Sequence, residues 1–291
     1  MTEMVSVNGR ITDLHTAHIP ILDRGFLYGD SIFESFRSYD GGFFGLSEHL
    51  ARFRRSADML RMPMPLDEVA WREQMAATMQ AAGSGDYVVR LIQTRGSAPF
   101  HQGLRKAEHP LSIVMVRELP PPDPSLVQHG CRLYLSSVRR NDSRALNPSA
   151  KTGNYLNNVL AMMEAEAHGC HEALMLNAQG EVTEGTRSNL FIVREGILCT
   201  PPLSAGILEG ITREMVMRVA CEEGISCQET PLMPDDMLQA QEVFITSSIS
   251  EVLPAVMLNE SVIGEGFPGP VTKQLAEAYG RYRDRNLERL F

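Results

Sequence analysis

A proline-rich segment divides this chain of 291 residues into two parts. Between Glu118 and Pro124, proline occupies positions 120, 121, 122 and 124. Proline fixes the backbone angle φ and has no N–H to donate to a β-sheet, so such a run forms a stiff, extended connection. We therefore predict two domains, at residues 1–117 and 126–291, with residues 118–125 as the linker between them.

The first part shows both strand-like and helix-like patterns. Runs of apolar and aromatic residues predict strands at 31–39, 87–94 and 111–117. Asp67 and Gly83 are suited to cap the two ends of one predicted helix. An earlier helix is indicated by apolar residues at helical spacing, namely Leu50, Phe53, Ala57 and Leu60.

The second part repeats this mixture. Turn-forming residues at 177–180 and 195–196 lie between short apolar runs, which predicts two hairpins. A strand is expected at 131–138, and helices are expected at 155–168, 211–223 and 271–286. Strands and helices in both parts indicate an α/β or α+β fold.

The composition excludes several classes of protein. Acidic residues outnumber basic residues by 36 to 27 and no basic stripe is present, so we expect neither a nucleic-acid nor a membrane partner. The five cysteines show no CxxC pair and no zinc-ligand spacing, which is typical of reduced thiols in the cytoplasm. Residues 1–10 lack the pattern of a signal peptide, and no apolar run reaches the roughly 18 residues that span a bilayer. We expect a cytoplasmic protein with no metal site.

Two formal motif matches fail in their context. Residues 264–269 match GxGxxG, but a dinucleotide site needs these glycines between a strand and a helix, and prolines interrupt the run here. We interpret this segment as a surface turn. Two histidine pairs lack a further ligand at zinc spacing and are interpreted as solvated or capping residues: His15 with His18, and His168 with His171.

Lys151 is the only lysine between Lys106 and Lys273, and it lies between a polar, loop-like segment and a predicted helix. Viewed alone, such a lysine is most often simply solvated. The functional alternative is a lysine that forms a Schiff base, with its amine acting as nucleophile and proton carrier.

Three later blocks contain groups suited to binding. Residues 184–191 (EGTRSNLF) place a carboxylate at the end of a predicted strand. Residues 206–213 form a glycine-containing turn that opens a helix, where free N–H groups suit a phosphate. Residues 246–250 (TSSIS) end a strand with hydroxyl groups. Taken singly, each block is equally compatible with an ordinary turn, helix start or strand end.

Together and in this order, the blocks resemble the fold-type IV pyridoxal-phosphate enzymes. This family includes branched-chain aminotransferases, D-amino-acid aminotransferases and aminodeoxychorismate lyases. The resemblance extends nearly from end to end and implies a small N-terminal α/β domain and a larger C-terminal pseudo-barrel domain. The matching segments are 23–37, 48–53, 151–155, 184–191, 210–213 and 248–252.

The resemblance also implies a role for each matching residue, with pyridoxal 5'-phosphate as the cofactor. Lys151 is expected to bind the cofactor covalently and to carry the proton. Glu184 is expected to keep the pyridine nitrogen protonated, so that the ring accepts electrons. Arg52 is expected to bind the phosphate, because the apolar stripe of its helix leaves position 52 off the core face. The remaining cofactor-binding residues are expected to be Tyr155, Ile211, Thr212 and Ser248.

The substrate-binding residues are those in which members of the family differ. Residues 28–37 are closer to the branched-chain pattern, whereas residues 186–189 and 247–251 depart from it. Ser35 occupies a position where the lyases place a hydroxyl residue. Of the Arg-x-His pair that binds carboxylate in D-amino-acid enzymes, only His101 is present. The residues expected to contact substrate are Tyr28, Phe33, Arg37 and Arg90.

We therefore predict an aminotransferase that exchanges amino groups between apolar, branched-chain-like amino acids and 2-oxo acids such as 2-oxoglutarate, in two half-reactions. The alternatives are D-amino-acid transamination and the lyase reaction that yields an aromatic amine and pyruvate. A cofactor-binding protein without activity would not need Lys151. Family resemblance further implies a homodimer whose partners are small-molecule substrates.

Overall fold

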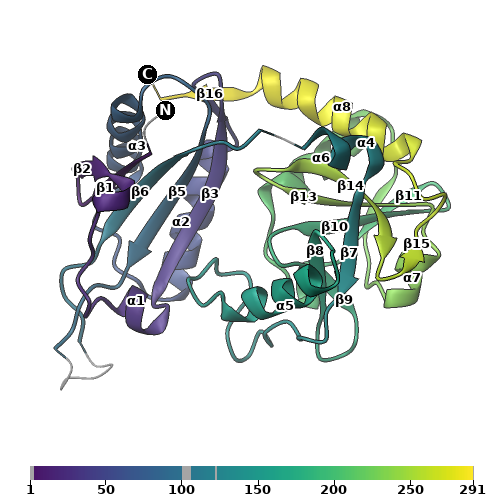
Figure 1. The fold of residues 1–291 in the computed structure, drawn as a ribbon, viewed down its shortest axis with the longest axis horizontal. Coiled ribbons are helices and arrows are strands. Elements are labelled where there is room, and N and C mark those ends of the chain that lie inside the picture. Colours follow the sequence, from purple (N-terminus) through teal and green to yellow (C-terminus); the bar gives the residue numbers. More distant parts are fainter. Residues whose placement is uncertain (1–2, 100–105, 122, 291) are drawn as a thin grey trace. The chain divides into compact units, whose positions relative to one another are not determined.

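The computed structural model describes residues 3–99, 106–121 and 123–290, and its chain forms two compact units (Figure 1). The first unit contains Met1–Pro120, Ala150–Tyr155 and Asn286–Phe291, and the second contains Pro121–Ser149 and Leu156–Arg285. The change of unit after Pro120 falls inside the predicted linker. Two short segments of the predicted C-terminal domain group with the first unit, and the predicted domain ranges remain a prediction. His101 lies outside the described residues.

The first unit contains a seven-stranded sheet in the order β16-β4-β3-β5-β6-β1-β2, and all neighbouring strands are antiparallel. The predicted strands at 31–39 and 87–94 are confirmed, and the third is shifted by one residue. The strands are β1 (Met4–Val7), β2 (Arg10–Asp13), β3 (Ser31–Tyr39), β4 (Gly42–Phe44), β5 (Tyr87–Thr94), β6 (Ser112–Glu118) and β16 (Leu287–Arg289). The helices are α1 (Arg24–Tyr28), α2 (Leu46–Met59) and α3 (Glu68–Ala82), with a short 3-10 helix at Leu14–Thr16.

The core of the first unit lies between this sheet and helices α2 and α3. Phe53 on α2 and Trp71 on α3 are both buried, and their rings meet edge to face with centroids 5.3 Å apart. The predicted caps of α3 are confirmed: the Asp67 side chain accepts a hydrogen bond from the Ala70 N–H, and Gly83 caps the other end. Apolar packing and a satisfied helix start therefore fix α2 against β3 and α3 against β1 and β6.

The second unit contains a nine-stranded, curled sheet that forms a half-barrel. Its order is β12-β11-β10-β13-β14-β7-β8-β9, with β15 paired to β14. The strands are β7 (Cys131–Leu135), β8 (Glu172–Leu176), β9 (Val182–Gly185), β10 (Asn189–Arg194), β11 (Ile197–Thr200), β12 (Cys227–Glu229), β13 (Glu242–Ser247), β14 (Glu251–Leu258) and β15 (Ser261–Val262). The helices are α4 (Pro124–His129), α5 (Leu156–Ala167), α6 (Ile211–Glu222), α7 (Pro234–Leu238) and α8 (Pro270–Arg285), with a 3-10 helix at Leu203–Ala205.

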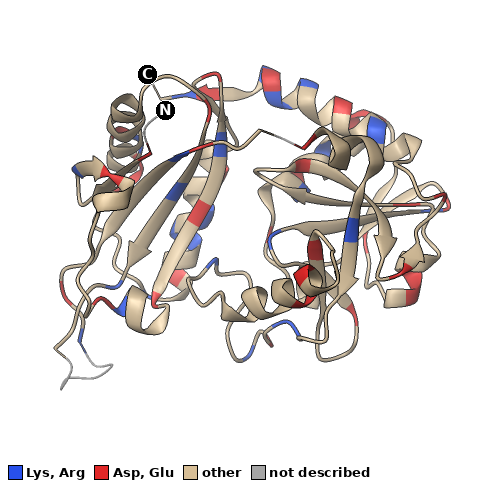
Figure 2. Cartoon of the chain, in the orientation of Figure 1, with Lys and Arg blue, Asp and Glu red and all other residues tan. Residues whose placement is uncertain are grey.

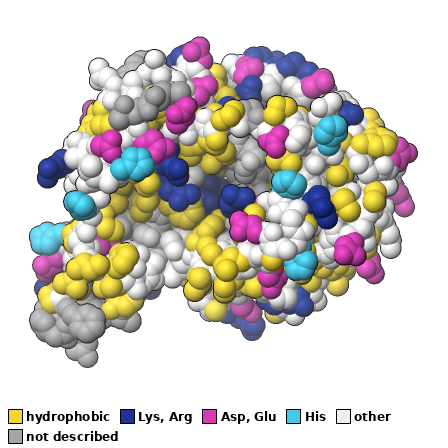
Figure 3. All heavy atoms as spheres, in the orientation of Figure 1, with side chains coloured by type: hydrophobic (Ala, Val, Ile, Leu, Met, Phe, Trp, Pro, Cys, Tyr) yellow, Lys and Arg dark blue, Asp and Glu magenta, His cyan; other side chains and the backbone are white. Residues whose placement is uncertain are grey.

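Both predicted hairpins are confirmed, as the antiparallel pairs β8–β9 and β10–β11. The glycine-rich residues 264–269 form turns between β15 and α8, in agreement with the interpretation as a surface turn. In the described part of the chain, no helix is long and apolar enough to cross a membrane and no side-chain group is suited to hold a metal ion. Charges of both signs are interspersed over the ribbon and over the face drawn with all atoms (Figures 2 and 3).

Candidate active site

The segment that carries Lys151 is held against β3 by backbone hydrogen bonds within the first unit. The Phe33 N–H donates to the Lys151 carbonyl (3.0 Å), and the Gly153 N–H donates to the Ser31 carbonyl (2.7 Å). The Lys151 N–H donates to Ser56 Oγ on α2 (3.1 Å). A Cβ atom at Gly153 would lie 2.2 Å from Ser31 Oγ, so a larger residue there would force the Ser31 hydroxyl to move. The backbone on both sides of the lysine is therefore fixed.

Three predicted site residues meet around the ring of a fourth, and together they form what we call the Lys151 cluster: Phe33, Arg90, Lys151 and Tyr155. Lys151 Nζ lies 4.7 Å from the centroid of this ring and Arg90 Cζ lies 4.9 Å from it. The Tyr155 ring meets it edge-on, with centroids 5.4 Å apart. The register pairs Ser35 with Arg90, which explains the hydrogen bond from Arg90 Nε to Ser35 Oγ (2.9 Å). The cluster places the Arg90 guanidinium and the Lys151 amine beside the same apolar ring, that of Phe33.

Two other predicted substrate residues have different surroundings. Arg37 lies further along β3, with its guanidinium 4.6 Å from the centroid of the Tyr39 ring. Tyr28, the last residue of α1, is half exposed and lines a cavity of about 460 Å³ together with Arg24, Asp30, Leu60, Arg95, Ala107 and Asn154. Neither observation tests a contact with substrate, so both roles stay predictions.

The expectation that position 52 lies off the core face is wrong. The Arg52 residue is only 4% exposed, and its Nε and Nη2 atoms each donate to one oxygen of Glu34 at 2.7 Å. A charged side chain is buried in this helix because a carboxylate on β3 balances it. The apolar stripe alone did not reveal that α2 also buries a polar stripe, formed by His49, Arg52 and Ser56.

Glu34 and His49 are residues that the sequence reading missed. His49 Nδ1 lies 2.8 Å from Glu34 Oε2, and because an ionised carboxylate only accepts, Nδ1 is the protonated nitrogen. Burial favours a raised pKa of the Glu34 carboxyl, but Arg52 and, to a smaller extent, His49 outweigh it and hold that pKa well below its usual value. Burial lowers the pKa of His49, which is therefore neutral at pH 7. The sequence did contain a signal that Glu34 is buried, because the alternation of β3 places it on the same face as Ile32 and Phe36.

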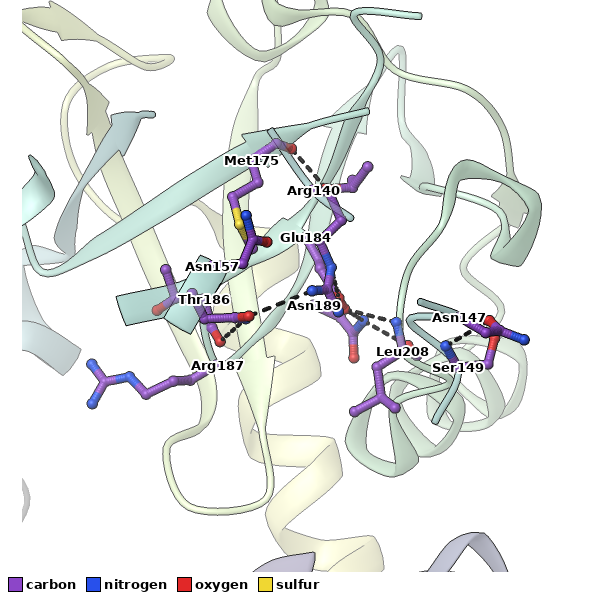
Figure 4. Close-up of polar contacts among 12 residues, drawn as sticks. Arg140, Asn147, Ser149, Asn157, Met175, Glu184, Thr186, Arg187, Asn189 and Leu208 are labelled. Carbon is purple, nitrogen blue, oxygen red and sulfur yellow. Dashed lines mark hydrogen bonds and ion pairs between the residues drawn. The ribbon is translucent and has the colours of Figure 1, made fainter. Parts of the chain in front are cut away.

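In the second unit, Glu184 is the centre of a buried polar network at the end of β9 (Figure 4). One carboxylate oxygen accepts from Arg140 Nε (2.9 Å) and Nη2 (2.8 Å). The other accepts from the Leu208 N–H (2.9 Å) and from Asn189 Nδ2 (3.2 Å). The Glu184 side chain is only 6% exposed, so it is not a solvated turn residue.

The turn after Glu184 is shaped by a second buried carboxylate that the sequence reading also missed. Glu172 on β8 accepts hydrogen bonds from the N–H and hydroxyl of Thr186 and from the hydroxyl of Ser188. A Cβ atom at Gly185 would lie 3.0 Å from the Glu172 side chain. Glu172 therefore fixes the turn that links Glu184 to β10.

The start of α6 has the features of an anion site. Its cap residue, Gly210, has no side chain to accept from the first N–H groups, and a Cβ there would lie 1.7 Å from Asn189 Oδ1. Thr212 Oγ1 and Ser248 Oγ are 3.5 Å apart beside this end. Thr246 Oγ1 is buried and has no hydrogen-bond partner among the described residues. Uncapped N–H groups, the helix dipole and nearby hydroxyls fit a phosphate monoester.

Comparison with known proteins identifies the class to which this geometry belongs. The model of the class IV amino-transferase family matches residues 31–257, and the chain is a member of that family. The protein is thus an aminotransferase of class IV.

Individual relatives cover nearly the whole chain. A Methanocaldococcus jannaschii protein, whose name proposes a branched-chain-amino-acid aminotransferase, is 38% identical over 97% of this chain and 96% of its own. The D-alanine aminotransferase of Bacillus licheniformis is 32% identical over 94% of this chain and 95% of its own. The branched-chain amino acid aminotransferase of Thermobaculum terrenum, solved in its PLP-bound form, matches with a TM-score of 0.87 and 28% identity, covering 100% of this chain and 99% of its own. The names of these relatives include both branched-chain and D-alanine aminotransferases.

Proposed function

We propose that this aminotransferase uses pyridoxal 5'-phosphate to exchange amino groups between apolar, branched-chain-like amino acids and 2-oxo acids such as 2-oxoglutarate. The main observation in support is the Lys151 cluster, because it places an amine beside an apolar ring and a guanidinium. An amine suits covalent attachment of an aldehyde cofactor. The ring suits an aliphatic side chain, and the guanidinium suits a carboxylate.

The residues present fit the cofactor, which would supply a ring that withdraws electrons from the substrate carbon. Glu184 is a fixed acceptor for a protonated ring nitrogen, with Arg140 as its compensating charge. The start of α6 and Ser248 would hold the phosphate, and in this proposal Arg52 contributes a cation to the same group. The unpartnered hydroxyl of Thr246 and the cradle at Gly210 support the phosphate assignment.

In this proposal Lys151 Nζ takes up the proton released by the substrate carbon that bears the amino group, and it would deliver that proton to the carbon of the cofactor that receives the amino group. Because the backbone at Lys151 is fixed, only the side chain has to move between the transfers, which limits the reorganisation required. Tyr155 packs against Phe33 and orders the ring that faces the amine. Arg90 would bind the distal carboxylate of glutamate, and Ser35 orients Arg90 by accepting from Nε. Tyr28 and Arg37 complete the proposed substrate set.

D-Amino-acid transamination is the second candidate, favoured by the D-alanine aminotransferases among the relatives and by residues 186–189 (TRSN).

A related branched-chain amino acid aminotransferase has been solved with N-(5'-phosphopyridoxyl)-L-glutamate, which supports glutamate and 2-oxoglutarate as one substrate pair here.

A cytoplasmic homodimer is also part of the proposal. The reduced cysteines support the location. Exposed apolar residues along α5 support self-association, namely Leu156, Val159, Leu160 and Met163.

A substrate panel tests the proposed activity. The holoenzyme is incubated with L- and D-amino acids, each with 2-oxoglutarate or pyruvate as acceptor, and both products are measured. Turnover of L-leucine with 2-oxoglutarate supports the proposal. Turnover of D-alanine with none of L-leucine would replace it by the D-amino-acid reaction. Pyruvate release from aminodeoxychorismate without an acceptor would identify a lyase, and Ser35 would then be the first residue to replace.

A further inference from the structure

Three polar side chains form a buried group within the apolar core of the first unit, and we call this group the buried triad: Glu34, His49 and Arg52. The side chains of Glu34 and His49 are fully buried, and that of Arg52 is 5% exposed. His49 and Arg52 lie three residues apart on α2, so both face the same side of the helix. Phe36 and Phe53 pack in the core that surrounds them, and the Phe36 ring lies 4.8 Å from that of His49.

Stability alone does not account for this arrangement. Two buried charges lose more hydration than their attraction returns unless the geometry is very good, and apolar residues of similar volume usually stabilise a fold equally well. What the pair does achieve is orientation. Both oxygens of Glu34 bind one edge of the Arg52 guanidinium at 2.7 Å, and this two-point contact fixes both the plane and the rotation of the group.

The contact involves the Nε–Nη2 edge of the guanidinium. The end that carries Nη1 therefore faces away from Glu34. His49 in turn donates from Nδ1 to Glu34 Oε2, so the carboxylate is itself held by a neutral, buried ring. The orientation of Arg52 therefore depends on Glu34, and that of Glu34 depends on His49.

We infer that Glu34 is a positioning residue for phosphate binding by Arg52, with His49 holding Glu34 in place. This inference rests on the proposed role of Arg52. A guanidinium that is already ordered loses little rotational freedom when an anion binds, and a preorganised site binds more tightly than a mobile one. Glu34 also balances the charge of Arg52 while no anion is bound, so the charged arginine can remain buried in the absence of the cofactor.

The test separates binding of the phosphate from binding of the rest of the cofactor. The full-length apoprotein is titrated with pyridoxal 5'-phosphate and, separately, with pyridoxal, which lacks the phosphate. For Glu34→Gln we expect the Kd of pyridoxal 5'-phosphate to rise about tenfold or more, while the Kd of pyridoxal stays within about twofold. Asp58→Asn is the matched control, because Asp58 forms an exposed ion pair with Arg54 on the same helix, at 3.3 Å. It should change neither constant.

Equal weakening of both ligands by Glu34→Gln, or no weakening, would overturn the inference. Arg52→Met removes the cation at similar side-chain length, and it separates this inference from the proposed function. If Arg52→Met leaves the ratio of the two Kd values unchanged, the phosphate role of Arg52 itself fails. If that ratio rises in Arg52→Met but not in Glu34→Gln, only the positioning role fails.

A second variant covers the case in which Glu34→Gln does not fold, as judged by circular dichroism. His49→Leu removes the donor to Glu34 and leaves the Glu34–Arg52 pair in place. We expect it to raise the ratio of the two Kd values about threefold. The effect is smaller than that of Glu34→Gln because the lost hydrogen bond is to Glu34 and does not involve Arg52 directly. His49→Gln, which restores a donor, should bring the ratio back toward that of the parent protein. An unchanged ratio in His49→Leu would overturn the inference.

Discussion

Replacing Glu184 by glutamine keeps the length of the side chain and removes its charge. The structure indicates what the change disturbs. One oxygen of Glu184 accepts two hydrogen bonds from Arg140, and the other accepts from the Leu208 N–H and from Asn189 Nδ2. In either orientation, the glutamine NH2 group would meet donors, so half of these hydrogen bonds are lost.

Glu184→Gln has two separate effects, one on stability and one on the rate. Arg140, whose side chain is 10% exposed, loses its counter-charge, and breaking a buried pair of this kind costs about 3 kcal/mol of the free energy of unfolding. A neutral glutamine also no longer favours a proton on the ring nitrogen of the proposed cofactor. We expect kcat to fall roughly 100-fold, which corresponds to about 2.7 kcal/mol in the barrier.

The assay is steady-state turnover of L-leucine with 2-oxoglutarate, together with cofactor content and urea unfolding of the same preparation. Glu172→Gln is the control, because Glu172 is a similarly buried carboxylate that shapes the same turn and forms no ion pair with the described residues. We expect this control to lose stability while kcat falls far less than in Glu184→Gln. An unchanged kcat in Glu184→Gln, or equal losses of kcat in both variants, would refute the role given to Glu184.

Three further outcomes are expected. Borohydride reduction of the holoenzyme should attach the cofactor to Lys151, and peptide mapping that finds it on another lysine would remove Lys151 from its role. Arg90→Ala should raise the KM for glutamate by more than that for leucine, because a distal carboxylate loses a charged donor; equal effects on both would indicate a general role. Since the pKa of Glu34 is lowered by folding, its contribution to stability is present above the unfolded pKa of about 4.3 and is lost as the pH falls. The urea midpoint of Glu34→Gln should therefore fall less between pH 6 and pH 3.5 than that of the parent, and parallel curves would contradict this.

Elements with a local signal were predictable from the sequence. A run of apolar and aromatic residues located β3, turn residues located both hairpins, and an aspartate and a glycine located both ends of α3. These signals lie within a few neighbouring residues, so tertiary context changes them little. The pairing of strands far apart in the sequence, such as β16 with β4, has no such signal.

In the candidate site, too, some residues had a signal in the sequence and others had none. Lys151 and Glu184 were found because their sequence blocks resemble those of a known family. Arg52 was placed on the wrong face because the reading of its helix counted apolar positions only, whereas a carboxylate from β3 allows a charge to be buried. Glu172 gave no signal at all, because its partners are hydroxyls and N–H groups that become neighbours only when β8 and β9 pair.

The pairing of β16 with β4 has a consequence for synthesis of the protein. Leu287, Glu288 and Arg289 form one of the two edge strands of the first sheet. The Glu288 carboxylate accepts from the N–H and hydroxyl of Ser47 and from Arg72. While the ribosome is still translating the second unit, the edge of β4 has no partner strand from its own chain. An open edge of this kind can pair with another nascent chain, so aggregation during translation should be most sensitive to changes in β4 and in these last three paired residues.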